Sequence, residues 1–405
     1  MRSGGRILLF ALIGLELGQL PAAGQSTGTQ RFPKQGRIAV RQEAATSAEG
    51  AAQGMQAPVL GFVSSAGTGE LRALLGIPGA SALGAPLAVT AGLLGVYFAP
   101  NQSYALLAPK AGNSLGLMTF QGAHEHAIIS ICGALPQPDI VAFSPGASAA
   151  ALYSKTEERL QVITGLPDSP HLARVVAASE LPDELRFLAV TDDGATLVEG
   201  TAQSAVYLLP QLGSPRLLYT AGDLQGMAFA PHSNDLVAFD RARSTAFLLQ
   251  NVDGASSYLP LADSLTGLDG NVFLETSRAG AVIASTNSTT VWKIDLRSLE
   301  VESIHLPGMP QMLEPLRIPG DYLLFYRVGF PAWILDSNGV PGSVSFVPAS
   351  AAPRRRTPFP LTAARDLNGD QNEQPESVSQ PVSGAGCTGA PEPTPATNPL
   401  PWTIR

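Results

Sequence analysis

Two histidines separated by a single residue are the clearest pair of potential metal ligands in this chain. His124-Glu125-His126 lies between two strand-like stretches, and an extended backbone places both imidazole rings on one face. Zinc or copper could use such a pair, but a catalytic site also needs a third ligand and an open position. No second ligand cluster stands in the sequence, so we interpret His124 and His126 as part of an exposed polar loop and keep them as metal candidates.

A second set of oxygen ligands lies near the C-terminus. Asp366, Asn368 and Asp370 occupy alternate positions, as at the start of a calcium-binding loop. Gln371 stands where such a loop needs glycine, and Ser377 stands where a bidentate carboxylate is expected. We therefore interpret the segment as an Asx-rich turn and keep the three residues as metal candidates.

The other reactive residue types form no recognisable constellation. Acid pairs at 157–158, 183–184 and 192–193 fall at expected turns, and His232 follows Ala230-Pro231 in the same kind of position. The sequence contains no phosphate-binding glycine loop, no His-Glu-x-x-His helix and no Cys-x-x-Cys pair. We predict no catalytic residues and no cofactor.

The elements that position these residues come from a degenerate repeat. It returns about every 43 residues, seven times between residues 59 and 348. Its clearest copy has three short apolar runs at 139–145, 149–154 and 159–165, separated by Ser, Gly, Pro and charged residues. Repeats of this length are typical of solenoids and propellers, in which one copy cannot bury its faces alone.

Two independent ladders of positions share this period. The second run of each copy contains Val59, Tyr104, Ala150, Thr196, Leu236, Ala281 and Tyr322. The third run contains Leu71, Leu117, Leu160, Val206, Ala246, Val291 and Ala332. The first run has six copies, near Phe98, Phe143, Val190, Phe229, Leu274 and Ile318.

The period and the character of the runs favour β-structure. Four short strands with their turns fit a repeat in the low forties, whereas helical repeats of that length need long 3.6-residue periodicity. The first run is continuously apolar, as expected for an inner strand buried on both faces. We predict an all-β, seven-bladed β-propeller at residues 58–350, with six or eight blades as alternatives.

The first copy lacks its first run, because residues 54–56 stand where it should begin. Propellers commonly remove free strand edges by pairing segments from opposite ends of the chain. Residues 349–362 could supply that strand, and a three-stranded blade is the alternative. The segment 174–179 is interpreted as an outer strand.

Composition and charge exclude some partners. Charged residues make up 14% of the chain, against about 25% in an average soluble domain, while Gly (41) and Pro (34) are abundant. The net charge is −8 and no basic stripe is present, which disfavours nucleic-acid binding. The arginines at 354–356 are interpreted as part of a solvated linker.

The two ends of the chain differ from the repeat region. Arg2 and Arg6 precede an apolar core at 7–15 and small residues at 22–24, a pattern that predicts a signal peptide over 1–24. We expect a disordered leader at 25–57 and a disordered tail rich in Pro, Gly and Ser at 351–405. The protein would then be exported, periplasmic or extracellular, with no transmembrane anchor after cleavage.

The chain has two cysteines, Cys132 and Cys387. Export permits disulfides, but Cys132 ends an apolar strand-like run and Cys387 lies in the tail. We interpret them as separate thiols, with Cys132 behaving as a small buried hydrophobe. A bridge between them is the alternative.

Several segments carry a resemblance to a known group. The run from Gly69 to Ala80, together with Phe98-Ala99-Pro100 and Phe143-Ser144-Pro145, resembles bacterial exported propeller proteins of the YVTN and WD-repeat-like type. The resemblance covers about 59–348. It implies the propeller fold and the binding of proteins or cell-surface components.

These observations favour a binding role. We predict an exported propeller that acts as a protein- or cell-surface-binding scaffold without catalysis, and whose partner is a protein or a cell-envelope component. The alternative is a secreted hydrolase or lyase acting on a polysaccharide or a lactone. That alternative predicts three or more His, Asp or Glu side chains converging at the mouth of the propeller channel.

Overall fold

The computed structural model describes residues 57–65, 70–87 and 92–349. All described residues belong to one compact unit of the chain. The expected signal peptide, leader and tail lie outside the described residues, as do Asp366, Asn368 and Asp370. No helix in the described ranges is long and apolar enough to cross a membrane.

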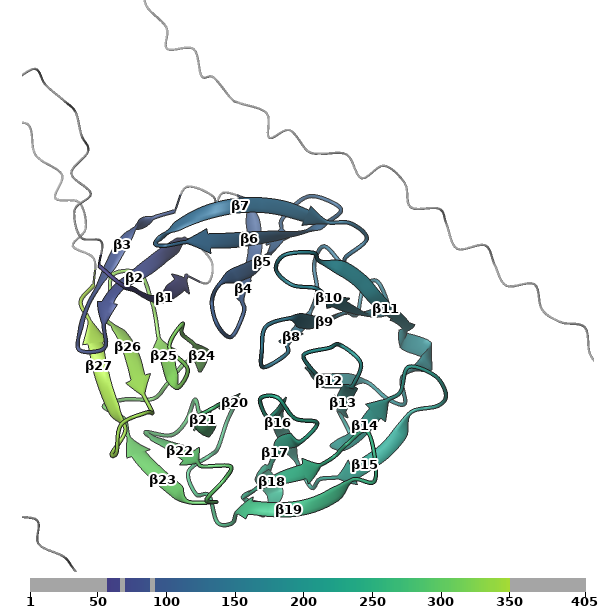
Figure 1. Cartoon of the computed structure of the whole chain (residues 1–405). Helices are drawn as coiled ribbons and strands as arrows, with labels where there is room; N and C mark the ends of the chain where they lie inside the picture. Colours follow the sequence, from purple (N-terminus) through teal and green to yellow (C-terminus); the bar gives the residue numbers. More distant parts are fainter. Residues whose placement is uncertain (1–56, 66–69, 88–91, 350–405) are drawn as a thin grey trace, which may run out of the picture. The chain divides into compact units, whose positions relative to one another are not determined.

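The described chain is a seven-bladed β-propeller (Figure 1), as predicted. Every sheet is antiparallel and its strands follow chain order, with the first strand innermost in blades 2 to 7 (Figure 1). The strands are β1 (Val59–Ser64), β2 (Leu71–Ile77) and β3 (Ala80–Pro86) in blade 1; β4 (Leu93–Phe98), β5 (Tyr104–Pro109), β6 (Leu115–Gln121) and β7 (His124–Ile131) in blade 2; β8 (Ile140–Phe143), β9 (Ala149–Ser154), β10 (Arg159–Thr164) and β11 (His171–Ala177) in blade 3; β12 (Leu185–Val190), β13 (Leu197–Thr201), β14 (Ala205–Leu209) and β15 (Arg216–Thr220) in blade 4; β16 (Leu224–Phe229), β17 (Leu236–Asp240), β18 (Thr245–Gln250) and β19 (Ser257–Ala262) in blade 5; β20 (Val272–Ser277), β21 (Gly280–Ser285), β22 (Thr290–Ile294) and β23 (Val301–His305) in blade 6; and β24 (Glu314–Pro315), β25 (Asp321–Phe325), β26 (Ala332–Asp336) and β27 (Ser343–Val347) in blade 7.

Two single-turn 3₁₀ helices interrupt the strands. η2 (Ala178–Glu180) follows β11, and η3 (Arg241–Arg243) joins β17 to β18. The segment at 174–179 that was predicted as an outer strand supplies most of its residues to β11, so that prediction is confirmed.

The core is divided among the interfaces between blades. Each pair of neighbouring blades shares one cluster of buried apolar side chains. The cluster that closes the ring joins Leu60 and Leu74 of blade 1 to Leu323 and Ile334 of blade 7. Burying a leucine side chain stabilises the fold by about 1.5–3 kcal/mol, so each blade depends on its neighbours for stability.

Burial is greatest in the second strand of each blade. All of β9 is buried, whereas every residue of the inner strand β8 is partly exposed. The expectation that the first strand would be the one buried on both faces is therefore wrong. The inner strands border the central channel, whereas the second strand lies farther from it and is covered by a blade on either side.

Blade 1 lacks an inner strand among the described residues, and a side chain takes over part of its role. Gln102, from the turn between β4 and β5, is fully buried. Its Oε1 accepts a hydrogen bond from Phe62 N at 2.5 Å, and its Nε2 donates to Pro315 O at 2.8 Å and Phe62 O at 3.3 Å. The backbone of Arg317 donates to Leu60 O at 3.1 Å. Side chain and turn thus satisfy edge groups that a strand would otherwise pair.

A glycine makes room for this contact. A Cβ atom at Gly61 would lie 2.6 Å from Gln102 Oε1 and 2.8 Å from Leu316 Cδ2. No side chain fits at that distance, so the free edge of β1 can be reached by Gln102 because residue 61 is glycine.

Cys132 lies directly after β7 and differs from its sequence interpretation. It is exposed and disulfide-bonded, so the interpretation as a buried free thiol is wrong. The other cysteine of the chain, Cys387, lies outside the described residues.

Candidate functional site

The inner strands of blades 2 to 7 enclose a cavity of about 310 Å³ in the central channel. One position on each strand is equivalent in register, because it pairs with the corresponding residue of the second strand. In chain order this position holds Tyr97, Ala142, Ala189, Ala228, Glu275 and Glu314. Blades 3 to 5 therefore present methyl groups at this level, and blades 6 and 7 present carboxyl groups.

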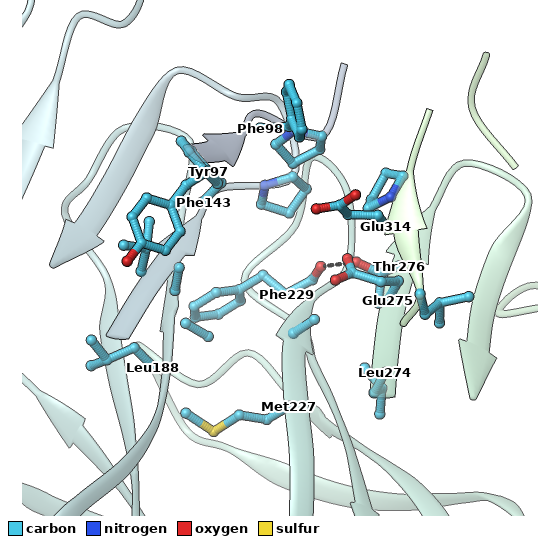
Figure 2. A pocket seen from close by; sticks show the side chains of 18 of the residues that line it. Tyr97, Phe98, Phe143, Leu188, Met227, Phe229, Leu274, Glu275, Thr276 and Glu314 are labelled. Carbon is cyan, nitrogen blue, oxygen red and sulfur yellow. Dashed lines mark hydrogen bonds between the residues drawn. The ribbon is translucent and has the colours of Figure 1, made fainter. Parts of the chain in front are cut away.

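Both carboxyl groups point into the cavity from adjacent blades (Figure 2). Burial chiefly, with the charge of Glu314 adding to it, raises the pKa of Glu275 to about 8. Burial raises the pKa of Glu314 to about 7. Near neutral pH the pair therefore retains at least part of one proton, the behaviour expected when two carboxyl groups share a poorly hydrated site.

Most of the side chains that line the cavity with the pair are apolar, but polar atoms supply more of its lining surface than apolar atoms do. The apolar residues include Phe143, which is partly exposed, and Phe98, Phe229 and Met227, which are buried between blades (Figure 2). Thr276 is the nearest hydroxyl in sequence, and its Oγ1 donates to Phe229 O at 2.5 Å, which ties β20 to β16. Among the described residues that line the cavity there is no Lys, Arg or His.

A second group of polar residues lies at one mouth of the channel, on the turns between first and second strands. There His232 Nδ1 is 3.7 Å from Asp192 Oδ2, and His232 Nε2 is 3.1 Å from a terminal nitrogen of Arg278. A guanidinium group can only donate, so Nε2 accepts and the imidazole proton lies on Nδ1, facing the carboxylate. Asp192 Oδ1 also accepts from Gly146 N at 2.6 Å. Turns of blades 3, 4, 5 and 6 are thereby linked.

The mouth forms a hollow of about 370 Å³ that adjoins the channel cavity. Its turns are stiffened by proline, which fixes the backbone dihedral φ. Arg317 also lines the hollow, stacks on the Phe62 ring at 4.9 Å and donates through Nε to Gln102 O at 3.2 Å. The lining residues include His232, Arg278 and Arg317 but no Asp or Glu. Two guanidinium groups thus face the hollow, and the nearby Asp192 carboxylate is engaged by Gly146 N and His232, so the hollow is cationic although the whole chain has a net charge of −8.

The chemistry open to these groups is limited by their contacts. His232 resembles a carboxylate-oriented general base, but its free lone pair is already engaged by Arg278. The carboxyl pair in the channel has protonation suited to acid–base work or to holding a cation. Nowhere in the described ranges do three or more His, Cys, Asp or Glu residues form a group that could hold a metal ion.

The histidines singled out in the sequence lie away from the channel. His124 and His126 are both exposed and stand on the outer strand β7, in strand rather than loop structure. Because side chains alternate between the two faces of a strand, both histidines lie on the same face of β7, as expected. The acid pairs at 157–158, 183–184 and 192–193 lie at turns or bends, and Asp192 is the member that reaches the mouth.

The carboxyl pair was missed because the first-run ladder was out of register. Leu274 precedes the channel-facing position by one residue, and Ile318 lies in the turn after β24. With the register that the strands show, Glu275 and Glu314 occupy the same repeat position. Two acids at one repeat position of an otherwise apolar run were the signal available in the sequence.

A Gly-x-Ser-x-Gly pattern also went unnoticed, at Gly112–Gly116. In esterases this pattern needs a strand-to-helix turn that exposes the serine. Here Ser114 immediately precedes β6 in a connection between two strands, and its Oγ accepts a hydrogen bond from Ser130 Oγ at 2.5 Å. The local structure does not match that of a nucleophile elbow.

Glu199 is a third carboxyl group that the sequence did not mark. It lies on β13, is fully buried, and neither side-chain oxygen has a hydrogen-bond partner. Burial chiefly, with the charge of Asp183 adding to it, raises its pKa to about 7. Unlike the channel pair, Glu199 does not line the cavity.

Comparisons with known proteins identify no family and no activity for this chain. No protein-family model matches the chain, and no curated protein matches it. Similar solved structures include hydrazine synthase from Kuenenia stuttgartiensis, which has 13% sequence identity and a TM-score of 0.42 over 76% of this chain and 100% of that one. A functionally unknown protein from Desulfotomaculum acetoxidans has 10% sequence identity and a TM-score of 0.48 over 72% of this chain and 100% of that one. The WD40 repeats of RRP9 are also similar, with 18% sequence identity and a TM-score of 0.36 over 49% of this chain and 60% of that one. At these identities and TM-scores the likenesses say nothing of activity.

Proposed function

We propose that this protein is an exported binding propeller that holds a protein partner at the cationic mouth of its channel. The observation that carries the proposal is the chain of contacts from Asp192 through His232 to Arg278, which fixes turns of neighbouring blades into one surface. A preorganised surface loses little conformational entropy when it binds a partner.

The charge of the mouth indicates the chemistry of the partner. Arg278 is exposed and uses one terminal nitrogen on His232, which leaves donors of its fork for a carboxylate. Arg317 and His232 line the same hollow, and no acid does. We therefore expect the partner to insert an acidic segment between the turns, with prolines such as Pro145 and Pro231 providing apolar contacts beside it.

Site-specific photo-crosslinking in the cells that produce the protein tests this proposal. A photoreactive residue replaces Asn101, which lines the mouth, and a matched one replaces Asn287, an exposed residue in the turn between β21 and β22 at the other end of its blade. We expect one protein to be crosslinked from position 101 and not from 287, and Arg278→Gln to reduce the product at least tenfold. Equal crosslinking from both positions, or no effect of Arg278→Gln, would refute the proposal.

A second function is favoured by one specific observation. Glu275 and Glu314 have pKa values raised to about 8 and about 7, which suits a general acid and a general base. A secreted hydrolase or lyase acting on a polysaccharide or a lactone could use them. It predicts turnover of such substrates by the intact protein and a loss of at least a hundredfold in Glu275→Gln. Absence of turnover across a panel of both substrate classes would eliminate this candidate.

A further inference from the structure

We propose that the central channel is a binding site for a small organic ammonium ion, held between the carboxyl groups of Glu275 and Glu314. The site is distinct from the partner surface proposed above, because Arg278 and Arg317 line the mouth but not the channel cavity. The argument depends on the cavity, on the charges within it and on the character of its walls.

The cavity is of a size that holds a ligand. Its volume of about 310 Å³ lies at the lower end of the range of about 300–1,000 Å³ common for small-molecule sites. The inner strands of six blades surround it (Figure 2), so its shape is set by the rigid part of the fold. Flexible loops contribute little to its lining.

The charges in the cavity are not compensated by the protein. No salt bridge or hydrogen bond joins the carboxyl group of Glu275 or Glu314 to another described side chain. No basic side chain lines the cavity. An uncompensated carboxyl group away from bulk water is costly, and a ligand with a positive charge would remove that cost. This is the feature that selects a cation over a neutral or anionic ligand.

The walls favour an organic cation over a metal ion. Phe143 is partly exposed where it lines the cavity, and Phe98 and Phe229 line it from the buried cores between blades (Figure 2); aromatic rings attract ammonium groups and pack against apolar bodies. Calcium needs six to eight oxygen ligands and zinc about four nitrogen, sulfur or oxygen ligands. Among side chains, the described cavity offers two carboxyl groups and the hydroxyls of Tyr97 and Thr276, which are already donated to Pro138 O and Phe229 O.

Calorimetry with benzylammonium as the probe tests the site. Benzyl alcohol has the same shape without the charge, and benzoate carries the opposite charge. We expect benzylammonium to bind with one-to-one stoichiometry, and benzyl alcohol and benzoate to bind at least tenfold more weakly. Glu275→Gln and Glu314→Gln should each weaken benzylammonium binding at least tenfold, whereas Glu157→Gln, in an exposed turn, should not change it.

Several outcomes would overturn the proposal. These are equal binding of benzylammonium and benzyl alcohol, unchanged binding in both channel variants, displacement of benzylammonium by stoichiometric calcium or zinc, and the absence of any binding at about 10 mM probe. Thermal unfolding of each variant shows whether it is folded, and replacing an uncompensated carboxyl group by an amide is not expected to unfold the protein. Loss of crosslinking at the mouth would leave the channel result unaffected, so the two proposals fail separately.

Discussion

Two walls of the same channel occupy equivalent positions and differ in chemistry. Ala142, Ala189 and Ala228 present methyl groups from blades 3 to 5, and Glu275 and Glu314 present carboxyl groups from blades 6 and 7. Alanine at three of these positions shows that the strand pairing does not require a carboxyl group there. The raised pKa values of the two acids show that the site disfavours their charged forms. Their presence is therefore better explained by what enters the channel than by the fold.

Glu275 and Glu314 form the acidic wall of the channel. The largest effect is expected from removing the side chain that is hydrogen-bonded to the backbone next to Glu314. Gln102→Ala deletes the amide that donates to Pro315 O, next to Glu314, and that accepts from Phe62 N. Leaving buried backbone groups without partners costs about 1–3 kcal/mol for each group, so we expect the free energy of unfolding to fall by about 3 kcal/mol in denaturant titrations. Gln137→Ala is the control, because Gln137 donates its amide to Pro109 O at the exposed surface.

If Gln102→Ala lost no more stability than Gln137→Ala, the edge of β1 would not depend on the hydrogen bonds of the Gln102 side chain. That result would also show that the position of Glu314 does not depend on the turn of blade 2.

The comparison can be inverted by making the apolar wall acidic. Ala228→Glu places a third carboxyl group in the cavity, where desolvation and its acidic neighbours should raise its pKa above the ordinary 4.5. The variant should lose about 2 kcal/mol of unfolding free energy at pH 8 and recover most of it at pH 4.5, where the new group is protonated in the folded state and about half protonated in the unfolded state. Ala228→Gln has the same size without the charge and separates crowding from electrostatics. Equal losses at both pH values would attribute the effect to volume alone.

Much of the fold could be predicted from the sequence, because repeats report directly on architecture. The third-run ladder lies in strands throughout, so that Leu160 is in β10, and the second-run ladder does so except at Thr196, which directly precedes β13. The missing first strand of blade 1 was also visible, because residues 54–56 stand where it should begin. Whether residues beyond 349 supply that strand lies outside the described part of the chain.

The candidate site could be predicted far less well. Its residues come together through the closure of the ring, which brings Asp192, His232 and Arg278 from turns about 40 residues apart into contact. Glu275 and Glu314 depend on strand register, and a shift of one residue exchanges the channel face for the core face. Short inner strands such as β24, with two residues, give too little periodicity to fix that register.

A carboxyl group in the core provides a test of what the channel contributes. Glu199 has a folded-state pKa of about 7, above the ordinary value, so the folded state binds the proton more tightly than the unfolded state does. Stability should then be greatest below about pH 4.5 and fall as the pH rises through 7. Glu199→Gln should remove on the order of 2 kcal/mol of that fall, measured by denaturant titration from pH 4.5 to 8.5.

Because Glu199 does not line the cavity, the same variant should bind benzylammonium as the unaltered protein does. A weakened affinity in Glu199→Gln would mean that uncompensated charge anywhere in the ring governs binding, and the distinction between the two kinds of carboxyl group would be lost.

The smallest expected effect concerns the coupling within the acidic wall. The charge of Glu314 is the second cause of the raised pKa of Glu275, after burial. Glu314→Gln removes that charge, so the pKa of Glu275 should fall from about 8 but remain above the ordinary 4.5, because burial is the larger cause of the raised pKa. Carboxyl-carbon NMR of labelled glutamate measures the change, with Glu199→Gln as the control that leaves Glu275 unaltered. If the pKa of Glu275 dropped to its ordinary value in Glu314→Gln, repulsion and not desolvation would dominate. The two carboxyl groups would then be well hydrated, and only their mutual repulsion, not the cost of burying charge, would favour a cation between them.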